Sequence, residues 1–389
     1  MRGVGRSLLS LPAVTAGFIA VLVGFTSSAV IVFAAAQAAG ATPEQAGSWM
    51  WALGLGMGLT TIGLSLHYRT PVKIAWSTPG AALLITSVAG LPLAESIGAF
   101  VLTGLLITAA GASGLFERLL DRIPLSLASA LLAGVLVRFG LDAFGALDDE
   151  FWLVTAMLAT YLAGRRWFGR YAAPAALVVG VGVGWAQGLL GHIDLPNGLT
   201  RPEWVTPSFS LQAAVGVAIP LFVVTMASQN VPGMAVLRSH GYAPPLSPII
   251  TTTGVATTVL APFGGFALNL AAISAAICMS PDIHPDRARR YPAAVWAGSF
   301  YVVIGLFGAA VAGFFAAFPT ELVVAIAGLA LLGTIGNGIA SALADERERE
   351  AALITFLVTA SGVTLLSVGS AFWGLVLGVV TRVVLRPRV

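Results

Sequence analysis

Apolar residues run in long stretches along most of the chain, and polar residues are confined to short pieces between them. A window of about 19 residues separates these stretches into fourteen segments that we expect to span a membrane. The third and tenth segments are too short to cross about 30 Å of hydrocarbon as helices. The segments cover residues 11–39, 48–66, 77–89, 96–116, 124–141, 151–164, 172–190, 211–230, 244–261, 268–280, 291–317, 320–342, 351–367 and 369–385.

The longest polar connector, residues 191–210, divides the segments into two groups of seven. Because seven is odd, the second group must enter the membrane upside down relative to the first, which is the inverted-repeat plan of many secondary transporters. Both short segments are third in their group. The sequence therefore predicts an all-α polytopic membrane protein of two inverted repeats (7+7), with short extended strands and half-helices at segments 3 and 10.

The short segments carry the residues that break a membrane helix. We expect Val72–Trp76 to enter the membrane as an extended strand and Pro79 and Gly80 to start a half-helix, where a missing N–H costs little. In the second half, Gly264–Phe266 would be the strand and Asn269 would lie near the half-helix start. Antiparallel pairing would satisfy both strands. Two half-helix N-termini would then point at one cavity and bind an anion without a buried Arg or Lys.

Composition and charge agree with a membrane protein. The chain is 57% hydrophobic and 10% charged, against about 25% charged in soluble domains. With the N-terminus in the cytoplasm, all basic residues except Arg138 and Arg201 fall in inside loops and tails, and Lys73 is counted among them. This bias predicts a cytoplasmic (inner) membrane protein with both termini inside. The basic pI thus reflects topology, and we expect no nucleic-acid partner.

Enzyme chemistry has no support in the sequence. Cys278 is the single cysteine, and the four histidines show no ligand spacing. No His-Glu-x-x-His or Gly-x-Ser-x-Gly motif and no carboxylate pair within a span occurs. We expect no catalytic residue, no metal site and no cofactor.

Three stretches, "PVKIAWSTPGAALL", "SQNVPGMAVLRSHGY" and "APFGGFALNLAAISAAIC", resemble the benzoate–proton symporter (BenE-type) family. That family is similar in fold to nucleobase–cation symporters and to sulfate and bicarbonate carriers. The resemblance implies a core domain that moves against a gate domain in a homodimer. Residues 1–118 and 206–318 would form the core domain, and residues 119–205 and 319–389 the gate domain.

The resemblance also bears on the substrate. Nucleobase relatives bind their substrate with glutamates at positions where this chain has Gln229 and Asn269. Amide groups donate hydrogen bonds to a carboxylate, which a glutamate would repel, so an anionic substrate is favoured. Because Gln229 and Asn269 replace the glutamates of these relatives, this chain also lacks the obvious proton carrier. The coupling ion is expected to be a proton, with Na⁺ left open.

The expected substrate contacts surround the predicted breaks. Hydroxyls in the first segment either line the cavity or bond their own helix, and Val231-Pro232-Gly233 is expected to break segment 8. Among the aromatic residues, Phe18 and Phe266 are our first choices for the ring slot. The candidate site residues are Ser77, Thr78, Gly80, Gln229, Asn230, Asn269, Thr26, Ser27, Phe18, Phe25 and Phe266.

These features predict a secondary transporter that imports benzoate or a similar small aromatic carboxylate with protons. A carrier of the same fold for nucleobases or inorganic anions is the first alternative. A channel is the second alternative, and it would carry flux without coupling to a gradient.

Overall fold

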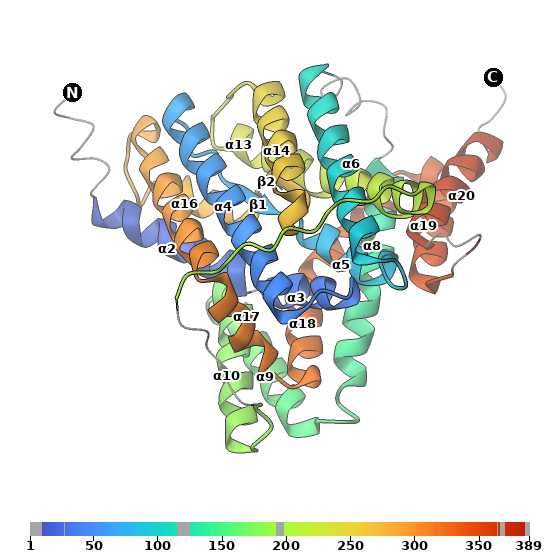
Figure 1. Cartoon of the computed structure of the whole chain (residues 1–389), viewed down its shortest axis with the longest axis horizontal. Coiled ribbons are helices and arrows are strands. Elements are labelled where there is room, and N and C mark those ends of the chain that lie inside the picture. Colours follow the sequence, from blue (N-terminus) through green and yellow to red (C-terminus); the bar gives the residue numbers. More distant parts are fainter. Residues whose placement is uncertain are drawn as a thin grey trace.

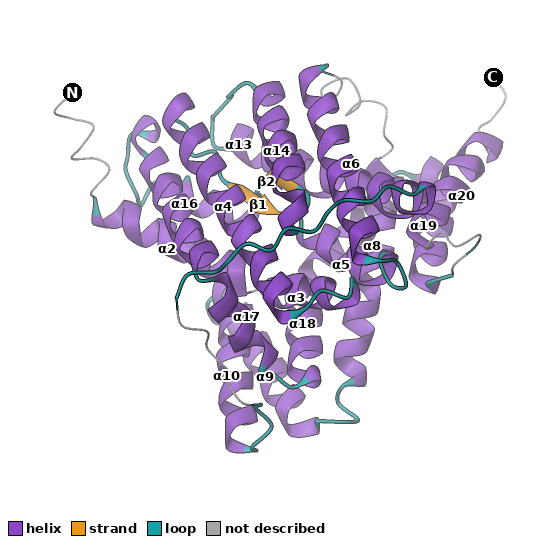
Figure 2. Cartoon of the chain, viewed as in Figure 1, coloured by secondary structure: helices purple, strands orange, loops and turns teal. Residues whose placement is uncertain are grey.

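The computed structural model describes residues 10–26, 28–114, 125–191, 198–363, 365 and 370–385. Most of these residues are helical (Figure 1), and two short strands lie among the helices (Figure 2). The helices before residue 191 are α2 (Leu11–Thr26), α3 (Ala29–Ala38), α4 (Pro43–Tyr68), α5 (Thr78–Ser87), α6 (Leu93–Ala112), α8 (Leu125–Gly145), α9 (Phe151–Trp167), η1 (Gly169–Tyr171) and α10 (Ala172–Ala186).

The helices after residue 198 follow a similar order. They are α11 (Leu211–Ala213), η2 (Ala214–Ala218), α12 (Ile219–Thr225), η3 (Met226–Asn230), α13 (Val231–Ser239), α14 (Leu246–Leu260), η4 (Ala261–Phe263), α15 (Ile273–Cys278), η5 (Arg287–Arg289), α16 (Tyr291–Leu306), α17 (Gly308–Ala316), α18 (Thr320–Ala342), η6 (Glu346–Glu348), α19 (Arg349–Ser361) and α20 (Ser370–Leu385).

Several helices have the length and composition of membrane spans. Within the described residues, six are long and apolar enough, and the number rises to eight when each of two bent helix pairs counts as one span. The expected single segment 291–317 is one of these pairs. Its two helices, α16 and α17, meet at an angle of 70°, so this segment is bent rather than one continuous helix. The bend brings Gly308 close to the carbonyl of Gly47 on α4, where a side chain would not fit.

The largest helix contacts fall within two sets. The strand set contains α2–α6 and α12–α17, and within it α4 packs along α16 and α6 along α14. The outer set contains α8–α10 and α18–α20, and within it α8 packs along α18. Figure 1 shows α4 and α14 on either side of the strands, with α9, α10, α19 and α20 at the periphery.

Glycines allow both contacts in the strand set to be close. A Cβ added to Gly54 would meet the Cα of Gly305 across the α4–α16 contact at 2.5 Å. A Cβ on Gly254 would meet the backbone nitrogen of Thr108 across the α6–α14 contact at 2.4 Å. Small residues at such crossings let helix backbones approach and gain van der Waals contact in lipid, where no hydrophobic driving force operates.

The strands pair as expected. β1 (Ile74–Trp76) and β2 (Leu268–Leu270) form a two-stranded antiparallel sheet with Ala75 opposite Asn269. Backbone hydrogen bonds extend the ladder at both ends, from Ser77 N–H to Ala267 O (3.1 Å) and from Ala271 N–H to Lys73 O (2.9 Å). Pairing therefore satisfies extended backbone inside the protein, which lipid alone could not do.

Two threonines complete the backbone pairing of the strands. Thr61 on α4 accepts a hydrogen bond from the N–H of Ile74 (2.9 Å), and Thr257 on α14 accepts one from the N–H of Leu268 (3.0 Å). Both threonine side chains are fully buried. The long helix before each strand thus supplies a hydrogen-bond acceptor for one N–H group of that strand.

The second strand lies later in the chain than predicted. Residues 264–266 are not the strand, and Asn269 lies at its centre rather than at a helix start. The glycines instead close the preceding helix. Gly264 adopts a left-handed conformation (φ +90°), and Gly265 donates to the carbonyl of Leu260. This is the usual way in which glycine ends a helix.

Pro232 does not break segment 8, in contrast to our prediction. The helix continues from Leu211 to Arg238 and widens to a π-helix at Met226–Asn230. Val231 donates its N–H to Met226 O, five residues back, and Pro232 follows directly. A second π segment, Ala214–Ala218, precedes Pro220 in the same way. The wider turns accommodate the proline rings, which would clash with an α-helical carbonyl.

Candidate functional site

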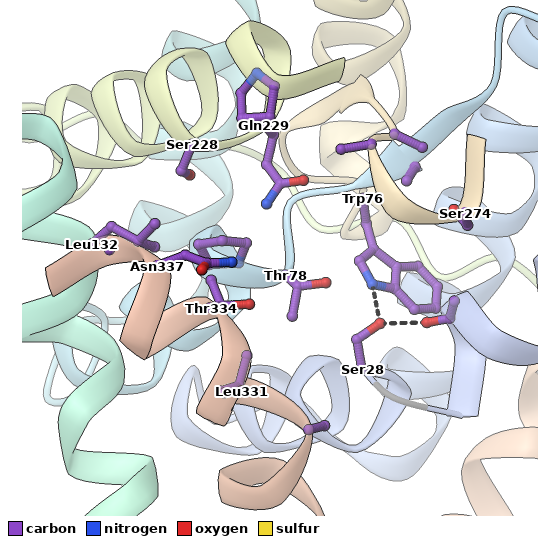
Figure 3. Close-up of a pocket in the computed structure, with 18 of the residues that line it drawn as sticks. Ser28, Trp76, Thr78, Leu132, Ser228, Gln229, Ser274, Leu331, Thr334 and Asn337 are labelled. Carbon is purple, nitrogen blue, oxygen red and sulfur yellow. Dashed lines mark hydrogen bonds between the residues drawn. The ribbon is translucent and has the colours of Figure 1, made fainter. Parts of the chain in front are cut away.

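A cavity of about 560 Å³ lies between the strand set and the outer set. The strand set contributes the end of β1, the residues directly after β2, the first turn of α5, the π segment η3, and parts of α2, α15 and α16. The outer set contributes α8, α9, α10 and α18. The cavity therefore collects residues from both halves of the chain, and Figure 3 shows several of them around one open space.

An aromatic wall covers the strand side. Trp76, the last residue of β1, lines the cavity and donates from Nε1 to Ser28 Oγ (2.9 Å). Ser28 in turn donates to Gly24 O (2.7 Å), as Figure 3 shows. These bonds hold the indole in one orientation. Phe25, which the sequence proposed as a ring contact, is not among the lining residues but packs on Trp76 at 5.6 Å between ring centroids.

Hydrogen-bonding side chains point into the cavity from the strand set. Gln229 and Ser228 lie in η3, and Thr78 lies in the first turn of α5. In Figure 3 the Gln229 amide extends toward the space beside Thr78. The π turn adds one residue to the helix and so alters which side chains face the cavity. Two of the predicted contacts, Gln229 and Thr78, therefore share this site.

The outer set adds a polar face and an exposed end. Thr334 and Asn337 on α18 lie across from Thr78 (Figure 3). Tyr161 and Arg165 on α9 also line the cavity, and Arg165 is exposed to solvent. The cavity thus reaches the protein surface at the end of α9.

A buried lysine lies directly behind the cavity wall. Lys73 is 1% exposed, and its Nζ lies 2.8 Å from Ser274 Oγ and 3.0 Å from the hydroxyl of Tyr301. Ser274 and Tyr301 both line the cavity. The expectation that the site would have no buried Arg or Lys is therefore wrong. The hydropathy window starts the third segment at residue 77, whereas the strand ladder already includes the carbonyl of Lys73.

Ser77 and Gly80 are not among the residues that line the cavity. Ser77 is the N-cap of α5 and accepts from Gly80 N–H (3.0 Å), and it also accepts from the Thr225 hydroxyl (3.0 Å). A Cβ at Gly80 would lie 2.7 Å from Ser77 Oγ. These residues shape the helix start, because the cap satisfies a donor that would otherwise be unpaired.

Asn230 and Asn269 are likewise outside the cavity lining, and both are fully buried. Asn230 Oδ1 accepts from the N–H of Leu270 (2.9 Å), so its amide pairs with the strand backbone. Asn269 Nδ2 donates to Ala267 O (3.0 Å). In the structure these two amides support β2.

The two preferred aromatic residues also lie elsewhere. Phe18 is 52% exposed and packs edge-on against Phe300 with the centroids 5.6 Å apart. Phe266 is fully buried between Trp49 and Phe100. Neither lines the cavity.

Thr26 is the last residue of α2, and its side chain lies outside the described part of the structure, as does all of Ser27.

Sequence reasoning missed several lining residues. Ser274, Tyr301, Thr334 and Tyr161 are single polar groups within apolar helices, and hydropathy gives no sign of which face they occupy. A usable signal existed for Lys73. It lies four residues before Ser77, too close to the predicted half-helix to remain at the membrane surface if the intervening strand enters the membrane.

The fold resembles those of solved anion transporters. The chain superposes on the structure of SLC26A9 with a TM-score of 0.65 at 12% identity, covering 96% of this chain and 65% of that chain. It superposes on the transmembrane domain of the cyanobacterial bicarbonate transporter BicA with a TM-score of 0.62 at 14% identity, covering 96% and 98%. At such low identity the likeness concerns the fold alone.

Two curated relatives match over nearly their full length. The inner membrane protein YdcO of Escherichia coli (strain K12) is 52% identical over 375 residues, with 96% of each chain covered. The benzoate membrane transport protein of Acinetobacter baylyi (strain ATCC 33305 / BD413 / ADP1) is 39% identical over 380 residues, covering 97% of this chain and 96% of that protein. Residues 7–384 match the family BenE, benzoate membrane transport protein. The chain is a membrane transporter, not an enzyme, and it belongs to the benzoate membrane transport protein family.

Proposed function

We propose that this transporter imports benzoate, or a similar small aromatic carboxylate, together with protons across the cytoplasmic membrane. The observation that carries the proposal is the cavity between the two helix sets, which combines a fixed aromatic wall with amide and hydroxyl donors. Trp76 offers a face for the ring, and Gln229 and Thr78 offer hydrogen bonds to the carboxylate.

The charge of the lining supports an anionic substrate. None of the described residues that line the cavity is acidic, and the basic residue among them is Arg165 at the exposed end. An amide and hydroxyls donate to a carboxylate without repulsion. A lining of this kind accepts a negative charge more readily than one built from glutamates.

We propose the 7+7 inverted repeat as the topology. In such a repeat, α4 and α14 are the second segments of their halves, and α6 and α16 belong to the fourth. The contact of α4 with α16 is then equivalent to the contact of α14 with α6, because in both the second segment of one half packs on the fourth segment of the other. The strand contacts of Thr61 and Thr257 are equivalent in the same way. In this scheme α5 and α15 are the half-helices, and fourteen segments cross or enter the membrane.

We propose further that the strand set is the core domain and the outer set the gate domain. The cavity lies between them, as alternating access requires. Its exposed end at Arg165 coincides with the side that the basic residues assign to the cytoplasm. The structure would then be open to the cytoplasm, with both termini on that side.

A homodimer is part of the proposal and rests on the family resemblance. Light scattering of the detergent-solubilised protein tests it, with a mass of two chains as the expected result and a mass of one chain as the contrary result.

Uptake of labelled benzoate into proteoliposomes tests the function. With the outside more acidic than the inside, we expect benzoate to accumulate, and dissipating the pH gradient should stop accumulation. Protein-free liposomes measure diffusion of the neutral acid. Accumulation that requires a Na⁺ gradient instead would replace the proton as coupling ion.

A competition screen distinguishes the alternatives. We expect benzoate, but not uracil or sulfate, to displace labelled benzoate. Displacement by uracil or sulfate alone would favour the nucleobase or inorganic-anion carrier. Benzoate flux that no gradient can drive uphill would indicate a channel.

A further inference from the structure

We propose that Lys73 is the proton-carrying counter-ion of the substrate carboxylate. The inference deepens the proposed benzoate–proton import and rests on it. It assigns the coupling proton to the amine of Lys73. The sequence alone identifies no group that could carry this proton.

The surroundings of Lys73 are polar but uncharged. Its side chain is 1% exposed, donates to Ser274 Oγ and to the Tyr301 hydroxyl, and lies 4.7 Å from the centroid of the Tyr301 ring. No carboxylate of the described residues forms an ion pair with it. A buried charge without a partner is costly, and a carboxylate in the cavity would supply the partner.

The titratable groups that face Lys73 are few. Tyr301 comes from α16, and Cys278 from α15 interacts with the amine electrostatically. The neighbouring α2 carries no titratable side chain. On α4, which packs against β1, the titratable residues Glu44, His67 and Tyr68 lie in the terminal turns. A substrate carboxylate would therefore be the main negative charge near the amine.

Two hydroxyls connect Lys73 to the cavity. Ser274 and Tyr301 both line it, and both accept a hydrogen bond from Nζ. A hydroxyl that accepts from an amine keeps its own hydrogen available to donate elsewhere. A carboxylate in the cavity can accept from these hydroxyls, whose O–H groups a protonated Lys73 polarises. One layer of hydroxyls thus separates the cation from the anion.

The charge balance explains coupling. Loading brings R–COO⁻ into the cavity and one proton from the outer solution onto the Lys73 amine, so the loaded site holds –NH₃⁺ and –COO⁻ and is neutral. Release to the cytoplasm returns both ions, and the empty carrier goes back with a neutral –NH₂. That amine still has two N–H groups for its two acceptors. Neither moving state then carries a net buried charge, which lipid disfavours.

Calorimetry of the intact wild-type protein is the first test. Benzoate binding is measured at neutral pH in two buffers with different ionisation enthalpies, which gives the number of protons taken up. We expect about one proton per benzoate bound, as linkage requires for a group that binds its proton with the anion. Binding without proton uptake would overturn the inference and leave benzoate recognition intact.

Two variants separate charge from proton exchange. Lys73→Arg keeps a charge that cannot be lost, so we expect benzoate-for-benzoate exchange without accumulation driven by a pH gradient. Lys73→Met is neutral, and we expect it to take up no proton and to bind benzoate about ten- to a hundredfold more weakly. Cys278→Ala alters the packing next to the amine and is expected to retain both accumulation and proton uptake.

The outcomes distinguish the two proposals. If the wild-type protein neither binds nor transports benzoate, the proposed function fails and this inference falls with it. If the wild-type protein couples benzoate to protons and Lys73→Arg still accumulates benzoate, only the inference fails. Proton uptake by Lys73→Met would also refute it. If Lys73→Arg does not fold, as thermal unfolding would show, the wild-type calorimetry decides alone.

Discussion

The two interrupted segments share a backbone plan but differ in what their side chains do. β1 with α5 and β2 with α15 each consist of a three-residue strand followed by a short helix, and each strand is held by a threonine on the preceding long helix. Around the first segment, Trp76 and Thr78 line the cavity and Lys73 lies behind it. Around the second, Ser274 on α15 lines the cavity, whereas the amides of Asn269 on β2 and of Asn230 on the adjacent η3 bond to backbone.

The helix starts differ as well. Ser77 caps α5 and Pro79 occupies its first turn, whereas Ala272 precedes α15 without a side-chain cap. The start of α5 is therefore fixed by a side-chain hydrogen bond, whereas the start of α15 is not. The comparison indicates that a repeated backbone can be kept for its geometry while the side chains of its two copies take different roles.

The largest expected effect comes from adding a negative charge to the cavity lining. Gln229→Glu places a carboxylate in the cavity, and like charges at such distances cost several kcal/mol, so we expect about 100-fold weaker benzoate binding. Equilibrium binding of labelled benzoate to the purified protein measures it.

Asn269→Ala provides the contrast for this prediction. Its amide donates to Ala267 O, directly before β2, and does not line the cavity, so benzoate affinity should stay at the wild-type value. Equal losses in the two variants would mean that Asn269 contributes to binding although it does not line the cavity.

A second prediction tests the repeated backbone. Thr61→Val and Thr257→Val each leave a buried strand N–H without its acceptor, which costs roughly 1–3 kcal/mol. Because the two threonines have matching roles, we expect similar decreases in thermal stability, measured by unfolding in detergent. A loss confined to one variant would show that the strands are not equivalent. Thr15→Val, on the exposed face of α2, controls for the loss of a threonine hydroxyl.

The sequence predicted the segments well because hydropathy reports burial in lipid directly. The bounds of α18 equal the expected 320–342, and α4, α8 and α20 differ from theirs by a few residues. The pairing of two extended pieces followed from the need to satisfy backbone in the membrane. The bounds of the second strand could not be predicted in this way, because glycine is typical of both an extended piece and a helix end. Gly264 ends a helix in the structure.

The candidate site was predicted less completely because a side chain's direction depends on tertiary packing. Gln229 and Thr78 line the cavity, but neighbouring Asn230 and Ser77 bond to backbone. In a π turn or at a helix cap, two neighbouring residues can point to different sides of the helix, one into the cavity and the other toward the backbone. From the sequence alone, Lys73, the one lysine of the chain, is also counted with the arginines of the inside loops, although the strand carries it into the protein interior.

A smaller effect is expected at the aromatic wall of the first segment. Trp76→Phe keeps a ring but removes the hydrogen bond to Ser28. A buried hydrogen bond contributes about 0.5–1.5 kcal/mol, so we expect benzoate affinity to fall by about two- to tenfold. Competition binding with substituted benzoates measures the change, and unchanged affinity for all of them would remove Trp76 from the ring slot.

The smallest effect is expected at Phe18, which sequence reasoning placed in the ring slot. Its ring is 52% exposed and contacts Phe300 rather than the cavity. Phe18→Leu preserves an apolar surface toward lipid, so the rates of benzoate uptake and the affinity should match those of the wild-type protein. Proteoliposome uptake measured beside Trp76→Phe gives the comparison. A loss at Phe18 that equals the loss at Trp76 would mean that the ring lies against the α2–α16 face, and that the cavity between the helix sets is not where benzoate binds.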